Sequence, residues 1–145
     1  MKAVIQRVNN ASVTSENTIV GSISSGLVVF LAIHQDDTED MVAKLADKIS
    51  KLRIFEDSDE KMNLSIIDTR GEILVVSQFT LYGDCNQGNR PSFINAAKPE
   101  KAEQYYEKFI QALRAQNIPV STGKFKTYMQ VSLVNDGPTT IIIDI

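Results

Sequence analysis

Two apolar runs constrain the fold of this chain more than any other feature. Leu27–Ile33 is apolar throughout, and Ile73–Val76 consists of β-branched and apolar residues. A strand that is apolar on both of its faces is buried on both, so each run predicts a strand deep in a sheet. The fold must therefore contain a sheet that is covered on both sides around these strands.

Two segments predict amphipathic helices that cover such a sheet. Asp36-Asp37-Thr38 supplies capping side chains and early negative charge, and apolar residues follow at helical spacing as far as Leu52. Pro99 suits the first position of a second helix, whose apolar face runs from Ala102 to Leu113. The aromatic residues on that face are more typical of a core than of a base-stacking surface.

The remaining segments predict shorter strands, with a hairpin turn at Glu16-Asn17 and a plain connection over Asn117–Gly123. Strands are expected at Lys2–Val8, Ala11–Thr14, Thr18–Ser22, Arg53–Phe55, Ser65–Ile67, Ile73–Phe79, Met129–Val134 and Thr140–Ile145. The turns are short enough for antiparallel pairing, and the two helices lie far apart along the chain. The predicted class is α+β: a mainly antiparallel sheet or barrel with two amphipathic helices packed against it.

Length and composition predict one domain over residues 1–145. The chain has 145 residues, of which 43% are hydrophobic, and this suits a single sizeable core. The N-terminus reaches Arg7 too early for a signal peptide, and no apolar run approaches membrane-spanning length. The single Cys85 excludes an internal disulfide framework. A cytoplasmic protein is expected.

The charge limits how the chain could bind nucleic acid. The net charge is −3 and the sequence pI is about 5.1, so the molecule as a whole is not a general phosphate binder. A nucleic-acid partner would have to be contacted locally. The candidates for a local basic surface are Arg90, Lys98, Lys101, Lys124 and Lys126, although scattered lysines that solvate the surface explain such a set more often.

Residues with familiar catalytic or metal-binding patterns are scarce. The acidic cluster from Glu56 to Glu60 lacks the glycine and terminal glutamate of a calcium loop, so a solvated turn is expected there, with no metal and no cofactor. The only histidine, His34, and the only cysteine, Cys85, could form a nucleophile pair only if they lay within hydrogen-bonding distance. A cysteine-dependent hydrolase remains one alternative.

A more informative stretch follows the buried strand that contains Ile73–Val76. Ser77–Asp84 places hydroxyl, amide and aromatic groups directly after this strand, where rigid backbone could hold them at the mouth of a pocket. The alternative is ordinary strand and turn chemistry. The long polar segment Gly83–Pro99 favours a functional or mobile loop, and Gly137-Pro138 alone predicts a turn between two strands.

Several motifs in order resemble those of the D-aminoacyl-tRNA deacylases, over essentially the whole chain. They are the opening Met1–Val8, Arg53–Asp57, Lys61–Ser65, Ser77–Tyr82, Arg90–Phe93, Thr122–Phe125, Met129–Val131 and Asn135–Thr140. The resemblance implies a homodimeric cytoplasmic enzyme that hydrolyses the ester joining a D-amino acid to the 3′ end of tRNA, and often glycine mischarged on tRNA. L-aminoacyl esters would be excluded.

The resemblance also assigns roles to residues. It places Ser77, Gln78, Phe79 and Thr80 in the pocket, with Thr80 beside the scissile carbonyl, and it places Phe93 and Met129 in the pocket wall. Gly137 and Pro138 would belong to a motif that enters the partner subunit's pocket, and Arg7 would help to hold that motif. An aminoacyl ester is already activated, so positioning and oxyanion stabilisation by main-chain N–H groups should suffice. The ribose 2′-hydroxyl of the substrate would assist, and Thr80 would orient rather than attack.

The chain departs from the common family pattern at a few positions. Thr139 stands where the family usually has valine, and Gly83 stands where alanine is frequent. Lys126-Thr127 stands directly after Phe125, where the family commonly has glycine-alanine. Lys126 matters most, because a position that is often glycine can require a positive φ. A noncatalytic dimeric binding protein on the same fold is the main rival interpretation.

Overall fold

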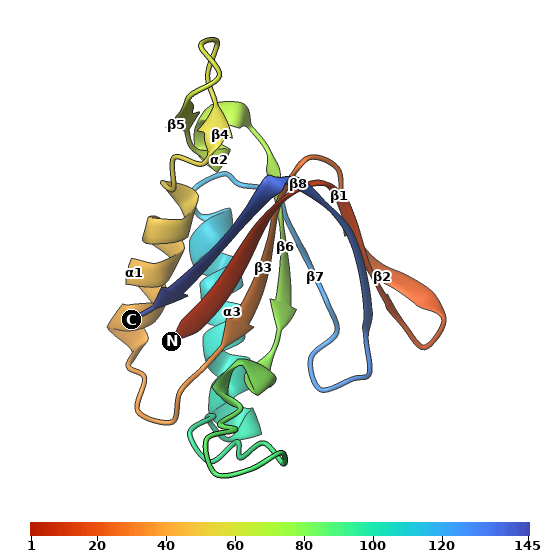
Figure 1. Ribbon diagram of the computed structural model, residues 1–145, viewed down its shortest axis with the longest axis vertical. Coiled ribbons are helices and arrows are strands. Elements are labelled where there is room, and N and C mark those ends of the chain that lie inside the picture. Colours follow the sequence, from red (N-terminus) through yellow and green to blue (C-terminus); the bar gives the residue numbers. More distant parts are fainter.

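The computed structural model describes residues 1–145 and forms a strongly curved sheet with helices on its outer face (Figure 1). Its elements are β1 Lys2–Ser15, β2 Thr18–Ile23, β3 Gly26–Ala32, α1 Glu39–Ser50, β4 Phe55–Glu56, β5 Met62–Leu64, α2 Ile66–Thr69, β6 Glu72–Ser77, the 3₁₀ helix η1 Phe79–Tyr82, α3 Pro99–Arg114, β7 Val120–Thr122 and β8 Gln130–Asp144.

The sheet is mixed, with the order β2-β1-β3-β6-β7 and β8 paired along β1. β1 runs antiparallel to β2, β3 and β8, whereas β3 and β6, and then β6 and β7, are parallel. Parallel neighbours need crossover connections, and α1 and α3 lie in these connections. The predicted α+β class is confirmed, and the sheet is mixed rather than purely antiparallel.

The sheet curls until β2 lies beside β7, which nearly closes a barrel. The Ser121 hydroxyl donates to the Ser22 carbonyl at 2.8 Å. Gly21 passes so close to Thr122 that a Cβ at position 21 would lie 2.4 Å from the Thr122 carbonyl oxygen. Only glycine permits this approach of two backbones.

The curved sheet separates two apolar clusters. The larger cluster lies between the sheet and the helices and includes Leu27, Val29 and Phe109, whereas the smaller lies on the opposite face and includes Val28 and Leu74. β3 therefore contributes side chains to both clusters, as its uniformly apolar sequence predicts. It pairs with β1 on one side and β6 on the other, so it is confirmed as a central strand.

The two predicted amphipathic helices are present as α1 and α3. Thr38 is the N-cap residue of α1, and Pro99 occupies the first turn of α3. The helices lie side by side on one face of the sheet, where Lys108 and Glu39 form an ion pair at 2.7 Å (Figure 1). Neither α1, α3 nor the short α2 is long and apolar enough to cross a membrane.

Two strands are longer than the sequence predicts. Lys2–Val8 and Ala11–Thr14 are parts of the single strand β1, because the polar pair Asn9-Asn10 stays within the ladder and Asn10 pairs with Val134. β8 likewise runs through Gly137-Pro138 instead of breaking there. Pairing with a long neighbour overrides the local turn signals in both cases.

Three shorter segments also differ from expectation. Ser65–Ile67 is the start of α2 rather than a strand, because the Ser65 hydroxyl and the Asp68 carboxylate cap each other's backbone N–H groups. The strand predicted over Ile73–Phe79 ends at Ser77. Within the predicted connection, Val120–Thr122 forms β7, which is too short to show periodicity and exists by pairing with β6.

Candidate functional site

The end of β6 presents a short polar and aromatic segment. The Gln78 N–H donates to the Leu31 carbonyl at 2.8 Å, so the ladder continues one residue beyond β6 before η1 begins at Phe79. The Gln78 side-chain amide then donates to the Thr80 hydroxyl. Phe79 and Thr80 are exposed, with 55% of Phe79 accessible. Rigid backbone therefore holds an exposed hydroxyl and an exposed aromatic ring at one end of the sheet.

The main-chain N–H groups of Phe79 and Thr80 are available to a ligand. They are the first two residues of η1, so neither has an acceptor within that helix. None of the backbone hydrogen bonds outside helices and strands uses either of them as donor. Two neighbouring free N–H groups are the kind of donors that stabilise a developing oxyanion.

Phe93 joins this segment from the long loop that follows it. Asp84 and Ser92 pair through two backbone hydrogen bonds of 2.8 and 2.9 Å, which fold the loop back on itself. The Phe93 ring then meets the Phe79 ring edge to face, with centroids 5.2 Å apart. The structure thus brings Phe93 into contact with the segment that follows β6.

Met129, the residue directly before β8, lies near the same end of the sheet. The Gly123 N–H donates to the carbonyl of Val75 at 3.1 Å, and Val75 lies two residues before Ser77 on β6. The Met129 sulfur covers Gly123 so closely that a Cβ on Gly123 would lie 2.6 Å from it. Met129 therefore borders the region where β6 ends.

Tyr82 closes η1 and is held among other side chains. Its ring packs edge to face on His34, with centroids 5.1 Å apart, and the Lys2 ammonium lies 5.1 Å from its centre. Burial raises the pKa of the Tyr82 phenol well above its ordinary value, and the nearby carboxylates of Asp37 and Asp144 add to this. The phenol therefore stays neutral and cannot serve as a base.

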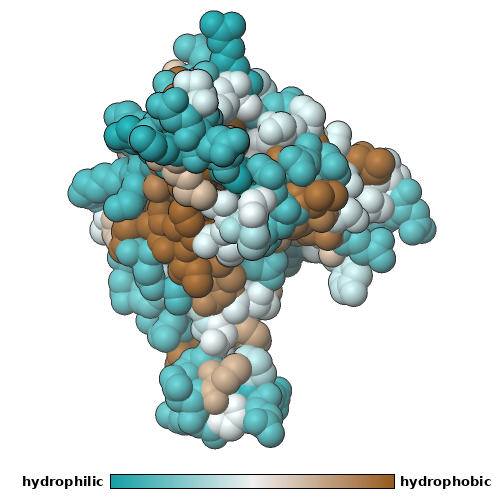
Figure 2. Space-filling view, turned by 45° about the horizontal axis from the view of Figure 1, so that its top comes forward, coloured by the Kyte–Doolittle hydropathy of each residue, from teal (hydrophilic) through white to brown (hydrophobic).

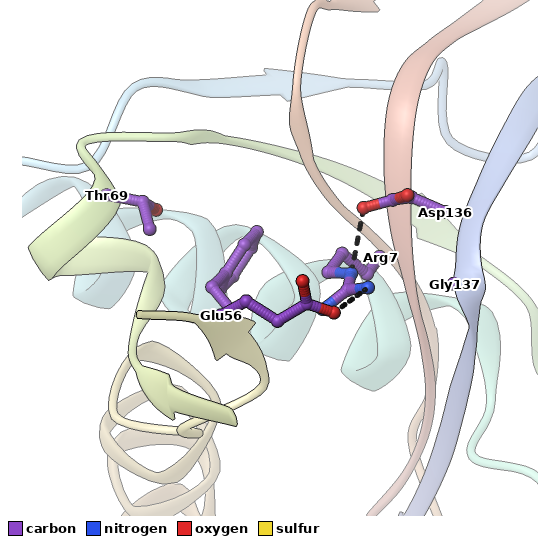
Figure 3. Close-up of a pocket in the computed structure, with 6 residues that line it drawn as sticks. Arg7, Glu56, Thr69, Asp136 and Gly137 are labelled. Carbon is purple, nitrogen blue, oxygen red and sulfur yellow. Dashed lines mark ion pairs between the residues drawn. The ribbon is translucent and has the colours of Figure 1, made fainter. Parts of the chain in front are cut away.

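Arg7 organises a second site at the bend of β1 and β8 (Figure 3). Its buried guanidinium donates to the Ile54 carbonyl at 2.7 Å, lies 2.9 Å from the Asp136 carboxylate and lies 3.6 Å from that of Glu56. Arg7, Glu56, Asp136 and Gly137 are among the residues that line an open hollow of about 350 Å³. Arg7 thereby ties the segment before Gly137 to the β4 region.

The two sites lie apart within one chain. Arg7 pairs with Leu27, which lies opposite Ile73, whereas Ser77 lies opposite Leu31. Arg7 is thus level with Ile73, four residues before Ser77 on β6. At the usual rise of about 3.3 Å per residue, the two positions are about 13 Å apart along the strand direction. Figure 1 shows the bend of β8 at the upper end of the sheet and η1 at the lower end. The chain does not bring Gly137-Pro138 to its own Ser77–Thr80 segment.

The backbone at Gly137-Pro138 is unusual in two respects. The peptide bond between the two residues is cis, and Gly137 has a φ of +124°. A Cβ on Gly137 would lie 2.6 Å from the Thr139 hydroxyl oxygen and 3.1 Å from the Arg7 guanidinium. Both residues are exposed, so this rigid backbone faces outward from the chain.

The sequence profile of the D-Tyr-tRNA(Tyr) deacylase family matches residues 4–144. This chain belongs to that family. A D-aminoacyl-tRNA deacylase of Thermotoga petrophila is 57% identical to this chain, and the match covers 99% of this chain and 97% of the relative. A D-aminoacyl-tRNA deacylase of Bacillus cytotoxicus is 53% identical, and the match covers 99% of both chains. The resemblance recognised from the motifs is confirmed.

Two solved structures share the fold of this chain. A structure titled c-Myc DNA Unwinding Element Binding Protein has a TM-score of 0.93 and 42% identity, covering 99% of this chain and 98% of its own. A probable eukaryotic D-amino acid tRNA deacylase has a TM-score of 0.85 at 19% identity over the same shares, a likeness that concerns the fold alone.

The departures from the usual family pattern have visible structural consequences. Lys126 has a φ of +60°, so this position has the positive φ that the resemblance led us to expect. Thr139 is buried, and its hydroxyl has no hydrogen-bond partner. Sequence reasoning missed Asp136 and Glu56 as partners of Arg7, since their proximity depends on the bend of the strands.

Replacing Thr139 with valine, the usual family residue, should stabilise the fold by about 1 kcal/mol, because it removes a buried hydroxyl without a partner and keeps the shape. Urea unfolding measures this difference. Thr140→Val is the matched control, since the Thr140 hydroxyl accepts from Gln6 at 3.1 Å and is exposed. Equal effects of the two substitutions would contradict the explanation.

The other candidate residues do not assemble into a site. His34 accepts from the Asp36 N–H at 3.2 Å and makes no hydrogen bond with Cys85, which is exposed. No group of three or more histidine, cysteine, aspartate or glutamate side chains is arranged to hold a metal ion. Among the predicted basic residues, Lys124 pairs with Glu16 at 3.0 Å, whereas Lys126 has no carboxylate partner.

Proposed function

We propose that this protein is a single-domain D-aminoacyl-tRNA deacylase that works in the cytoplasm. It hydrolyses the ester between a D-amino acid and the terminal ribose of tRNA, and it also accepts glycine mischarged on tRNA. The observation that carries the proposal is the pair of free N–H groups at Phe79 and Thr80, held directly after the end of β6. The exposed single Cys85 suits a reducing compartment.

The chemistry requires little from protein side chains. Water attacks the ester carbonyl, and the N–H groups of Phe79 and Thr80 stabilise the oxyanion as it forms. The ribose 2′-hydroxyl next to the ester assists proton transfer. The Thr80 hydroxyl is already bonded to the Gln78 side chain, which suits an orienting role better than attack.

The complete pocket uses two copies of the chain. Gly137-Pro138 is exposed and lies about 13 Å from Ser77 along the strand direction alone, and β1 and β3 also separate its strand β8 from β6. A motif that acts on the substrate must therefore act on the pocket of a second copy. β8 also carries exposed apolar residues, including Val134 and Ile142, the latter 69% accessible. Figure 2 shows apolar patches on the side of the molecule crossed by β8, and a homodimer would cover such surface.

The selection of D- over L-aminoacyl esters then follows from steric exclusion of the L side chain. The backbone carbonyls of the partner's Gly-Pro motif would hold the substrate ammonium, and the rigid main chain would leave no space where an L side chain projects. Rejection by a clash suits rigid backbone better than a mobile side chain. Glycine has no side chain to exclude and is accepted.

The deciding experiment compares hydrolysis of D-tyrosyl-tRNA and L-tyrosyl-tRNA by the purified protein with a chelator present. Rapid loss of the D-ester alone supports the chirally selective, metal-independent function. Absence of turnover on both esters would instead favour a binding protein on the same fold. The 42% identical structure is named as such a protein. Cleavage of both esters would contradict the proposed exclusion.

Thr80→Val should lower kcat for D-tyrosyl-tRNA by less than about tenfold, because the substitution removes one orienting hydrogen bond and keeps the main-chain N–H. Single-turnover kinetics measures the effect. Complete loss of turnover, together with an acyl-threonine trapped in the parent enzyme, would make Thr80 the nucleophile and reverse the assignment.

A further inference from the structure

A second surface lies on the loop between β7 and β8. Tyr128 is 88% exposed, although its ring is large and apolar. Lys126 is exposed, and its ammonium forms no ion pair in the chain. Together with the hairpin residues Glu16 and Asn17, they line an open hollow of about 460 Å³. Neither the core nor the proposed chemistry uses these side chains.

The loop that carries Tyr128 and Lys126 is held in one shape. The Ser15 hydroxyl donates to the Thr127 hydroxyl at 3.0 Å, and the Thr127 hydroxyl donates to the Lys124 carbonyl at 2.9 Å. The Lys124 ammonium is paired with the Glu16 carboxylate at 3.0 Å, so its charge is balanced locally. Lys126 is therefore the free cation at this hollow, presented next to an exposed ring.

The hollow adjoins the pocket end of the sheet. Tyr128 directly precedes Met129, whose sulfur lies over Gly123, and Gly123 is bonded to Val75 near the end of β6. Figure 1 shows the loop from β7 to β8 and the end of β6 at the same lower end of the molecule. The exposed Tyr128 ring therefore lies at the same end of the molecule as the end of β6.

We propose that Tyr128 and Lys126 bind the nucleotide directly before the terminal adenosine of the tRNA. The inference rests on the proposed function, which places the terminal adenosine in the pocket. The Tyr128 ring stacks on an unpaired base, and the Lys126 ammonium contacts a phosphate, a combination that suits single-stranded nucleic acid. A local contact of this kind also reconciles a tRNA substrate with a net charge of −3.

The test compares two substrates, D-tyrosyl-tRNA and D-tyrosyl-adenosine, which lacks the preceding nucleotides. Tyr128→Ala should reduce kcat/KM on the tRNA substrate about tenfold, since stacking on one base is lost, and should leave the adenosine ester unaffected. Lys126→Ala should make KM for the tRNA substrate less dependent on salt, with the slope of log KM against log salt concentration reduced by about the value for one phosphate contact. Tyr128→Phe should retain activity on both substrates.

Lys61→Ala is the matched control, because Lys61 is an exposed lysine in the turn between β4 and β5. This substitution should leave the kinetics on both substrates unchanged. Equal losses on both substrates would overturn the inference and show that the loop only positions Met129. Unchanged kinetics of Tyr128→Ala on the tRNA would overturn it as well. If the parent protein cleaves neither substrate, the proposed function fails and the inference fails with it.

Discussion

Replacing Gly137 with alanine should remove discrimination between D- and L-tyrosyl-tRNA. The added Cβ would lie 2.6 Å from the Thr139 hydroxyl oxygen and 2.9 Å from the Thr139 nitrogen, so the backbone of the motif must shift. A displacement of about 1 Å can cost about 100-fold in rate, so kcat/KM for the D-ester should fall by about that factor. Hydrolysis of the L-ester should rise above background, and parallel assays of both esters measure the ratio.

Gly88→Ala provides the matched control for this substitution. Gly88 also has a positive φ, of +150°, but nothing lies within 4 Å of a Cβ built there. Alanine at position 88 therefore carries backbone strain of about 1 to 3 kcal/mol without a clash, and it should leave selectivity intact. A Gly137→Ala enzyme that kept the parental preference for the D-ester would refute the exclusion mechanism.

Replacing the main-chain N–H of Phe79 with an ester oxygen should reduce kcat on D-tyrosyl-tRNA by about 100- to 1000-fold, the cost of losing one oxyanion donor. Incorporation of phenyllactic acid at position 79 makes this change and keeps the aromatic ring. KM should change little, because the donor acts mainly on charge that develops in the transition state. Steady-state kinetics separates the two parameters.

Phenyllactic acid at position 93 is the control for the ester substitution. The Phe93 ring packs against Phe79, and its N–H is not a donor in any backbone hydrogen bond outside helices and strands. The same chemical change there should leave kcat within about twofold of the parent. Similar kcat losses at both positions would indicate a general disturbance of the pocket, and no loss at position 79 would exclude its N–H as the oxyanion donor.

Local sequence patterns were reliable where burial and helix capping decide the structure. The apolar run Leu27–Ile33 identified a central strand, and Thr38 and Pro99 marked the starts of α1 and α3. The Glu16-Asn17 turn is also as predicted, with both residues at positive φ. These features depend on contacts between near neighbours in the sequence, or on side chains that must leave water whatever their partners are.

The family motifs predicted the components of the candidate site, but the arrangement of these residues depends on the tertiary structure. The resemblance assigns Ser77 and Gly137-Pro138 to one functional site, yet strand register places them at different levels of the sheet. The sequence could not show that Asp136 and Glu56 meet Arg7, because this requires β1 and β8 to bend together.

The sequence by itself determined the class of fold, the two covering helices, the family and the residue types available for chemistry. Tertiary structure decided the continuity of β1 and β8, the parallel pairing of β3, β6 and β7, and the distance between the two motifs. The physical reason is that these features come from hydrogen bonds between strands far apart in the chain. Their formation outweighs local preferences such as those of Asn9-Asn10 and Gly137-Pro138.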